Sequence, residues 1–236
     1  EELGDKKGLA STYLNIGIVF RCQGNFDKSI EQYLKSIRIL ENLDDQEGVA
    51  KCYNNIGNIH FHQQNYEKAL AYFSKSQVIF EKYNNTKGLA MSYNNIGIIY
   101  KRQDNPQKAI EYYNKAANIS KQLGDKKMLA KNYNNIGILY SNQHNIDKAF
   151  EYINMAIKIM EEIDDKNGLS KAYSSIARLN FTIADTLSGA IQKHHLKQAI
   201  KFGNWALKIS QEIGALPQQS SATSILKDTY TKLKRY

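Results

Sequence analysis

The pentapeptide Tyr93-Asn94-Asn95-Ile96-Gly97 lies in the middle of the chain and occurs three times in identical form. The other two copies begin at Tyr53 and Tyr133, so consecutive copies are 40 residues apart. Diverged copies with the same spacing surround Ile16 and Ile176. Self-similarity at a period of about 20–50 residues is typical of solenoids and repeat arrays. The repeat therefore decides the fold class before any other feature of the sequence is considered.

Each 40-residue repeat is predicted to fold as two helices, here called helix A and helix B. Ala10, Tyr13, Ile16 and Phe20 lie on one face of a 3.6-residue period in the first repeat. An Asp or Asn precedes each helix, where its side-chain oxygen accepts from free backbone N–H groups. The expected caps are Asp5, Asp45, Asn85, Asp125 and Asp165 for helix A, and Asn25, Asn65, Asn105 and Asn145 for helix B.

A glycine recurs inside helix A, at Gly17, Gly57, Gly97 and Gly137. Glycine inside a helix costs about 1 kcal/mol relative to alanine, so its recurrence needs a packing reason. We infer that helix B approaches helix A closely at these positions. Because one pair cannot bury its apolar stripes alone, neighbouring pairs must stack. The sequence predicts an all-α solenoid of antiparallel helix pairs, wound as a right-handed superhelix.

One repeat carries an aromatic, Leu, Gly, aromatic, Ala, aromatic, Ala pattern at Tyr93, Ile96, Gly97, Tyr100, Ala109, Tyr113 and Ala116. This pattern resembles the tetratricopeptide repeat, although the period is 40 rather than 34 and the proline that ends helix B is absent. The Gly124-Asp125 linker resembles arrays in Pins-type and kinesin-light-chain-type adaptors and in bacterial sensor kinases and regulators. The resemblance implies that A helices line a concave groove that binds proteins or peptides.

The repeats predict a single array over 1–236, and we expect the chain to be part of a longer protein. An insertion near 184–193 predicts a longer turn or an extended helix A, and the adjacent His194-His195 pair is expected in a solvated turn. Residues 217–236 are predicted to be a capping helix or a truncated repeat, with Leu226 and Tyr230 in the core. The predicted units are 5–44, 45–84, 85–124, 125–164 and 165–214, followed by the helix at 217–236.

The composition excludes several classes of protein. With 42% hydrophobic and 23% charged residues, the chain is not a disordered one. No apolar run approaches the roughly 20 residues of a membrane span, and two cysteines are too few for a disulfide framework. No Gly-rich phosphate loop, H-E-x-x-H or Cys-x-x-Cys motif is present. We expect a non-catalytic protein without cofactor or metal, located in the cytoplasm, or in the periplasm if it is the sensor part of a membrane-bound kinase.

The face of helix A opposite the core carries the candidate peptide-binding residues. Asparagine amides offer both a donor and an acceptor, which suits an extended peptide backbone. Alternatively, recent duplication has copied them without selection for binding. A line of isoleucines is expected to form shallow pockets or to pack against the neighbouring A helix. The first asparagine row is Asn15, Asn55, Asn95 and Asn135, the second is Asn54, Asn94 and Asn134, and the isoleucines are Ile18, Ile98 and Ile138.

Charge is distributed unevenly between the helices. The A segments 9–22, 49–62, 89–102, 129–142 and 169–182 contain no Asp or Glu. Their basic residues are Arg21, Lys51, Lys101, Arg102, Lys131, Lys171 and Arg178. A concave wall of one sign attracts the opposite charge, although a solvated basic face is the simpler interpretation.

These features together favour a signalling adaptor or sensory module that binds an extended, acidic peptide in the groove. Nucleic-acid binding is an alternative, motivated by the net charge of +9. It is disfavoured because aromatic residues for base stacking are sparse on the groove face, where Phe61 and Phe181 are the candidates. Weak self-association through the array ends is a third possibility.

Overall fold

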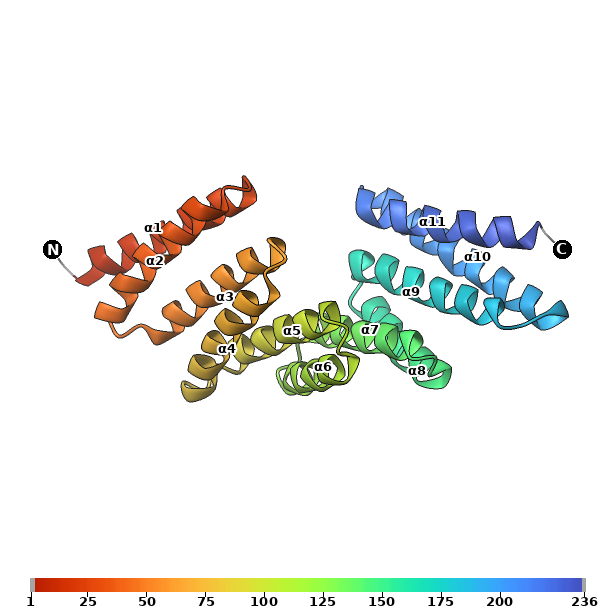
Figure 1. Cartoon of the computed structure of the whole chain (residues 1–236), viewed down its shortest axis with the longest axis horizontal. Helices are drawn as coiled ribbons and strands as arrows, with labels where there is room; N and C mark the ends of the chain where they lie inside the picture. The colour runs from red at the N-terminus through yellow and green to blue at the C-terminus, as the bar shows by residue number, and fades with distance from the viewer. Residues whose placement is uncertain (1–2, 235–236) are drawn as a thin grey trace. The chain divides into compact units, whose positions relative to one another are not determined.

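The computed structural model describes residues 3–234, and within that range all regular structure is α-helical (Figure 1). Short turns join the consecutive helices. The helices are α1 (Leu3–Cys22), α2 (Phe26–Asn42), α3 (Gln46–His62), α4 (Tyr66–Lys82), α5 (Thr86–Arg102), α6 (Pro106–Gln122), α7 (Lys126–Asn142), α8 (Ile146–Glu162), α9 (Lys166–Asp185), α10 (Gly189–Glu212) and α11 (Leu216–Leu233).

The helices form two compact units that divide within α6. Unit 1 runs to Ile119 and contains α1 to α5 with most of α6, and unit 2 begins at Ser120 and contains α7 to α11. Within the units, A helices pack against the B helices that follow them, namely α1 with α2, α3 with α4, α7 with α8 and α9 with α10. The predicted all-α repeat of helix pairs is therefore confirmed within each unit. The single array over 1–236 stays a prediction.

The turns between helices repeat one backbone device every 20 residues. A residue in the left-handed region, such as Asp44 (φ 54°) or Gly124 (φ 68°), ends the helix. The next residue caps the following helix, as when the Asp45 side chain accepts from the Gly48 N–H at 2.9 Å. The predicted caps from Asn25 through Asp165 are confirmed. Asp5 is the exception, because α1 already begins at Leu3 and places Asp5 inside the helix.

The recurring glycines of helix A lie where a side chain of helix B occupies the space. A Cβ atom on Gly97 would lie 2.9 Å from the Tyr113 ring, and one on Gly137 would lie 2.6 Å from Ile153 Cγ1. Both facing side chains are fully buried. The inferred close approach is confirmed, and it explains why glycine is kept despite its poor helix propensity.

The insertion in the fifth repeat lengthens both helices, whereas the sequence predicted a longer turn or a longer helix A. At 20 residues α9 is three longer than α7, and at 24 residues α10 is seven longer than α8. The prediction that His194-His195 lies in a solvated turn is wrong, because both residues lie within α10. There, His195 Nδ1 lies 2.9 Å from Asn180 Oδ1 of α9, so the longer helices also pack on each other.

Of the two residues of the last helix that were predicted to lie in the core, one is buried and one is exposed. Leu226 of α11 is 7% exposed, but Tyr230 is 44% exposed and its assignment to the core is wrong. The buried residues of α11 are Ala222, Ile225, Leu226 and Thr229. The core stripe thus follows a spacing of three and four residues and turns away before Tyr230.

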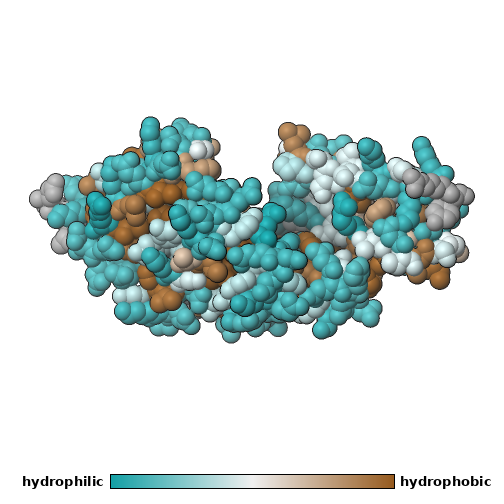
Figure 2. Space-filling model, viewed as in Figure 1, coloured by the Kyte–Doolittle hydropathy of each residue, from teal (hydrophilic) through white to brown (hydrophobic). Residues whose placement is uncertain are grey.

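Apolar side chains also remain at the surface. On α1, Leu9, Ile16 and Val19 are 45%, 38% and 53% exposed, and hydrophobic surface shows as brown over the N-terminal helices in Figure 2. The predicted weak self-association would need such a surface and stays a prediction. Among the described residues, no helix combines the length and the apolar character needed to cross a membrane.

We expect the two cysteines to differ sharply in reactivity. Cys22 is exposed, whereas Cys52 is buried in unit 1. Burial raises the pKa of the Cys52 thiol to about 11, so little of the nucleophilic thiolate forms near neutral pH. Treatment of the folded protein with iodoacetamide at about pH 8 should add one group, at Cys22. Peptide mass spectrometry would contradict the structure if Cys52 reacted at a similar rate before unfolding.

Candidate functional site

Each unit contains a hollow of about 470 Å³ that is lined mainly from the predicted binding face of its A helices. In unit 1, α1, α3 and α5 line the hollow, and in unit 2, α7, α9 and α11 do so. Corresponding positions of the repeat recur in both, such as Asn55 in unit 1 and Asn135 in unit 2. The structure thus brings together part of the predicted site twice, once in each unit.

The first asparagine row is divided between these hollows and the rest of the surface. Asn55 and Asn135 line the hollows of unit 1 and unit 2, and both are partly exposed. Asn15 is exposed and lines neither hollow. Asn95 lines neither hollow, and its amide donates to Asn54 Oδ1 at 2.7 Å. This row therefore supplies one groove amide in each hollow rather than a uniform ladder.

The second asparagine row is buried, which corrects the expectation that it lies exposed on the groove face. Asn54, Asn94 and Asn134 are 7%, 1% and 8% exposed. In unit 1, Asn54 Nδ2 donates to Ser92 Oγ of the next A helix at 3.4 Å. These side chains face neighbouring helices because stacking of repeats covers this side of helix A. The two rows look alike in the sequence because the distances between neighbouring helices cannot be read from it.

The isoleucine line is also divided. Ile138 lines the hollow of unit 2, whereas Ile18 packs against the core around Tyr33. Ile98 is partly buried and lines neither hollow. One isoleucine thus lines a hollow and another packs on the core of unit 1, so the pocket hypothesis stays a prediction.

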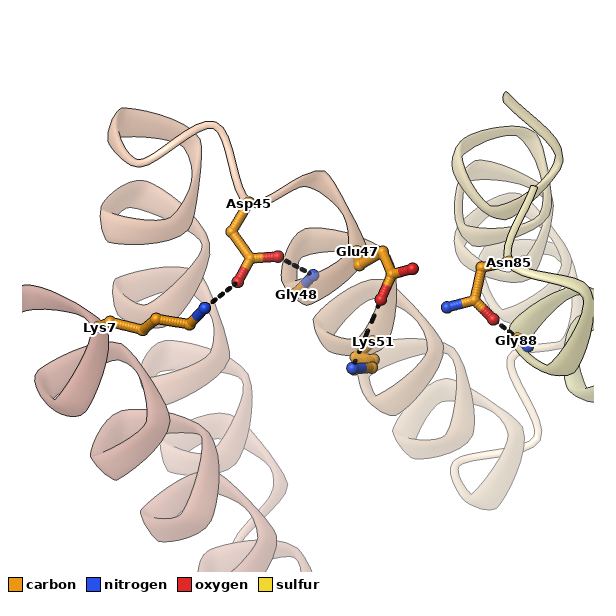
Figure 3. Close-up of polar contacts among 7 residues, drawn as sticks. All are labelled: Lys7, Asp45, Glu47, Gly48, Lys51, Asn85 and Gly88. Atoms are coloured by element: carbon orange, nitrogen blue, oxygen red, sulfur yellow. Dashed lines mark hydrogen bonds and ion pairs between the residues drawn. The ribbon is translucent and has the colours of Figure 1, made fainter. Parts of the chain in front are cut away.

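Basic residues line both hollows without an acidic residue among the lining side chains. Lys51 and Lys87 line the hollow of unit 1, and Lys171 and Arg178 line that of unit 2. Lys51 is not isolated, however, because its ammonium lies 3.9 Å from the Glu47 carboxylate one turn earlier (Figure 3). Glu47 lies in the first turn of α3, just outside the acid-free segment 49–62, so the predicted single-sign face is partly neutralised in unit 1.

The remaining predicted cations lie away from the hollows. Lys101 and Arg102 occupy the last turn of α5 and line neither hollow. Burial lowers the pKa of Lys101, and the adjacent Arg102 charge lowers it further. Burial also lowers the pKa of Lys131, and the charge of Lys171 adds to this effect. On these A helices, like charges are therefore close enough to repel each other. A bound anion would reduce this repulsion.

Several lining residues were missed by the sequence analysis. Pro217, Gln218, Ser221 and Ile225 of α11 close one side of the hollow in unit 2. Their positions depend on how α11 packs on the longer α9 and α10, which no repeat of the sequence specifies. In unit 1, the helix B residue Phe80 reaches the hollow next to Gly88. The recurrence of glycine at Gly48, Gly88 and Gly168 is the signal by which this contact could have been found.

The chemistry of the lining side chains decides what the two hollows can bind. Among the described residues, no three His, Cys, Asp or Glu side chains come together as a group that could hold a metal ion. Both linings offer amides, cations and apolar surface, and the lining in unit 2 also offers serine hydroxyls. Such a lining suits recognition by hydrogen bonds and charge.

Comparison with protein-family models gives matches along most of the repeats. Three models, each described as tetratricopeptide repeat, match residues 9–43, 48–122 and 130–162. Together these matches cover more than half of the chain. A search of curated protein sequences finds no match.

Three solved structures illustrate the similarity of fold. Aspartyl phosphate phosphatase F from Bacillus subtilis matches with a TM-score of 0.71 and 16% identity, over 95% of this chain and 60% of that one. The Rap conjugation gene regulator of plasmid pLS20, in complex with the Phr* peptide, gives 0.69 and 15%, over 94% and 62%. The apo form of RapI gives 0.66 and 18%, over 97% and 85%. At such identities the likeness is one of fold, and this chain spans about three fifths of the length of the first protein.

Proposed function

Because this chain belongs to the tetratricopeptide-repeat family, we propose that it is a non-catalytic module that binds an extended, acidic peptide segment along its A helices. In a signalling adaptor or a sensory protein, such binding would recruit a partner or report its presence. The observation that carries the proposal is the lining of the two hollows. Each combines two cations, groove amides and apolar surface with no carboxylate among its lining residues.

The chemistry of these hollows supports a peptide as the ligand. An extended peptide presents backbone N–H and C=O groups, which Asn55 and Asn135 match with both a donor and an acceptor. Alternate side chains of an extended strand point to opposite sides, so acidic residues at every second position would face Lys171 and Arg178 in unit 2. One structurally similar protein, the pLS20 Rap regulator, was solved with a peptide bound.

Charge reversal in the hollow of unit 2 tests this proposal. The probe is an end-blocked octapeptide of alternating Asp and Ala, with a fluorescent label for anisotropy titration at low salt. Exposed ion pairs contribute about 0–1 kcal/mol each, and reversal adds repulsion. The double variant Lys171→Glu with Arg178→Glu should therefore weaken binding about tenfold, or about 1.4 kcal/mol. The effect should shrink at physiological salt, where screening is stronger.

The matched control reverses two charges on B helices of the same unit. Lys158 and Lys208 are exposed on α8 and α10 and line neither hollow. The variant Lys158→Glu with Lys208→Glu changes the net charge equally. If both double variants weaken binding alike, overall charge governs association and the proposed site is wrong. A single-stranded oligonucleotide that displaces the peptide and binds at least as tightly would favour the nucleic-acid alternative instead.

A further inference from the structure

The hollows of the two units differ in whether their buried asparagine is satisfied. In unit 1, Asn54 uses both ends of its amide. Its Nδ2 donates to Ser92 Oγ at 3.4 Å, and its Oδ1 accepts from Asn95 Nδ2 at 2.7 Å. Both partners belong to α5, the next A helix. The protein itself therefore completes the hydrogen bonding of this amide.

The equivalent residue of unit 2, Asn134, has lost both of these partners. Ala172 stands where Ser92 would be, and Ser175 stands where Asn95 would be. The Ser175 hydroxyl donates to the Lys171 carbonyl at 3.0 Å instead. In the described part of the chain, Asn134 Oδ1 has no hydrogen-bond partner although the residue is only 8% exposed.

A second unpartnered group lies on the opposite helix. Ser174 of α9 is also 8% exposed, and its Oγ finds no hydrogen-bond partner among the described residues. Asn134 and Ser174 both line the hollow of unit 2. Buried polar groups are nearly always hydrogen-bonded, so two orphans that border one hollow indicate a place for an external partner.

We propose that the hollow of unit 2 takes the carboxamide side chain of a glutamine or asparagine, whose NH2 donates to Asn134 Oδ1 and whose carbonyl accepts from Ser174 Oγ. The inference deepens the proposed function and rests on it for the rest of the peptide. The binding segment would then be acidic around one neutral amide residue. Unit 1 would lack this preference, because Asn54 is already satisfied by Ser92 and Asn95.

The chemistry of the pair disfavours other side chains. A carboxylate has no proton for Asn134 Oδ1, and oxygen lone pairs would face each other. A lysine or arginine cannot accept from Ser174 and would meet Lys171 and Arg178 on the same lining. A carboxamide carries a donor and an acceptor side by side and costs less to desolvate than a charged group.

Three blocked amino acids of similar length test the site without any peptide. N-acetyl N-methylamides of glutamine, glutamate and methionine would be titrated into ¹⁵N-labelled protein and followed by ¹H–¹⁵N NMR. One added hydrogen bond is worth roughly fivefold in affinity. The glutamine compound should therefore bind at least about fivefold more tightly than the other two. The shifted signals should come from α7 and α9.

The matched variant copies into unit 2 the residue that satisfies the buried asparagine of unit 1. Ser175→Asn restores the residue type of Asn95 and should cap Asn134 Oδ1, so it should weaken glutamine binding about fivefold while preserving the fold. Asn95→Ser should release Asn54 Oδ1 without creating glutamine binding in unit 1, because Asn94 stands there in place of Ser174 and does not line the hollow. Under the simple asparagine-ladder hypothesis, Ser175→Asn would instead strengthen peptide binding.

The inference is overturned if the glutamate compound binds as tightly as the glutamine compound, or if neither compound shifts the NMR signals of residues that line the hollow. It is also overturned if Ser175→Asn leaves the affinity for the glutamine compound unchanged. Titration of the Asp-Ala octapeptide into the same samples tests the proposed binding of acidic peptides separately. Octapeptide binding without glutamine preference would remove the inference and leave the proposed function standing. Glutamine binding without octapeptide binding would remove the proposed function and support the amide site.

Discussion

Gly137→Ala should lower the free energy of unfolding of this protein by about 2 kcal/mol, against the usual direction for a helix interior. Alanine is the better helix former by about 1 kcal/mol, but overpacking of a core commonly costs about 1–3 kcal/mol or more. A Cβ at Gly137 would lie 2.6 Å from Ile153 Cγ1, 3.1 Å from the Ile153 backbone N and 3.2 Å from the Ala149 carbonyl oxygen. Two of these three atoms are backbone, so the contact can be relieved only if α7 and α8 move apart.

Gly8→Ala is the control for this experiment. Gly8 lies inside α1, and a Cβ there would meet no heavy atom within 4 Å. This variant should therefore gain up to about 1 kcal/mol from helix propensity alone. Urea denaturation followed by circular dichroism gives both values. Equal stabilisation by the two variants would contradict the close approach of the helices in unit 2.

Leu226→Ala should destabilise unit 2 by about 2–4 kcal/mol, in the usual range for removal of a buried leucine side chain. Leu226 is 7% exposed, and its side chain fills the position that a Cβ on Gly203 of α10 would occupy, with Cδ2 only 2.8 Å from that point. Truncation leaves a cavity between α10 and α11 that glycine cannot fill. The expected readout is a lower unfolding midpoint in urea.

Tyr230→Ala provides the comparison within the same helix. The repeat register assigned both residues to the core, but Tyr230 is 44% exposed. Its truncation should cost less than about 1 kcal/mol, as for most surface substitutions. If Tyr230→Ala were as harmful as Leu226→Ala, the placement of α11 would be wrong and the register read from the sequence would be right.

The candidate site was predictable only in part, because a repeat specifies positions on a helix and not the neighbours of those positions. The sequence identified the face of helix A that contributes to the hollows and several lining residues, including Asn55, Asn135, Ile138, Lys171 and Arg178. It treated Asn54 and Asn55 as two equivalent rows, yet stacking buries the first and leaves the second partly exposed. Adjacent residues on a helix are about 100° apart, so a small change in neighbour packing decides which of them meets solvent.

The sequence by itself determined the helix pairs, their turns and their close packing. Each of these depends on local chemistry that recurs every 40 residues: an Asx cap, an apolar stripe, and a glycine opposite a large side chain. Only the tertiary structure decided which polar groups are satisfied. Asn54 and Asn134 have the same local sequence, but their hydrogen bonds depend on residues about 40 positions further along, in the next A helix. In unit 1, Ser92 and Asn95 hydrogen-bond to the Asn54 amide, whereas in unit 2 Ala172 and Ser175 leave Asn134 Oδ1 without a partner. Which residues meet in this way depends on distances between helices, and a one-dimensional pattern does not contain those distances.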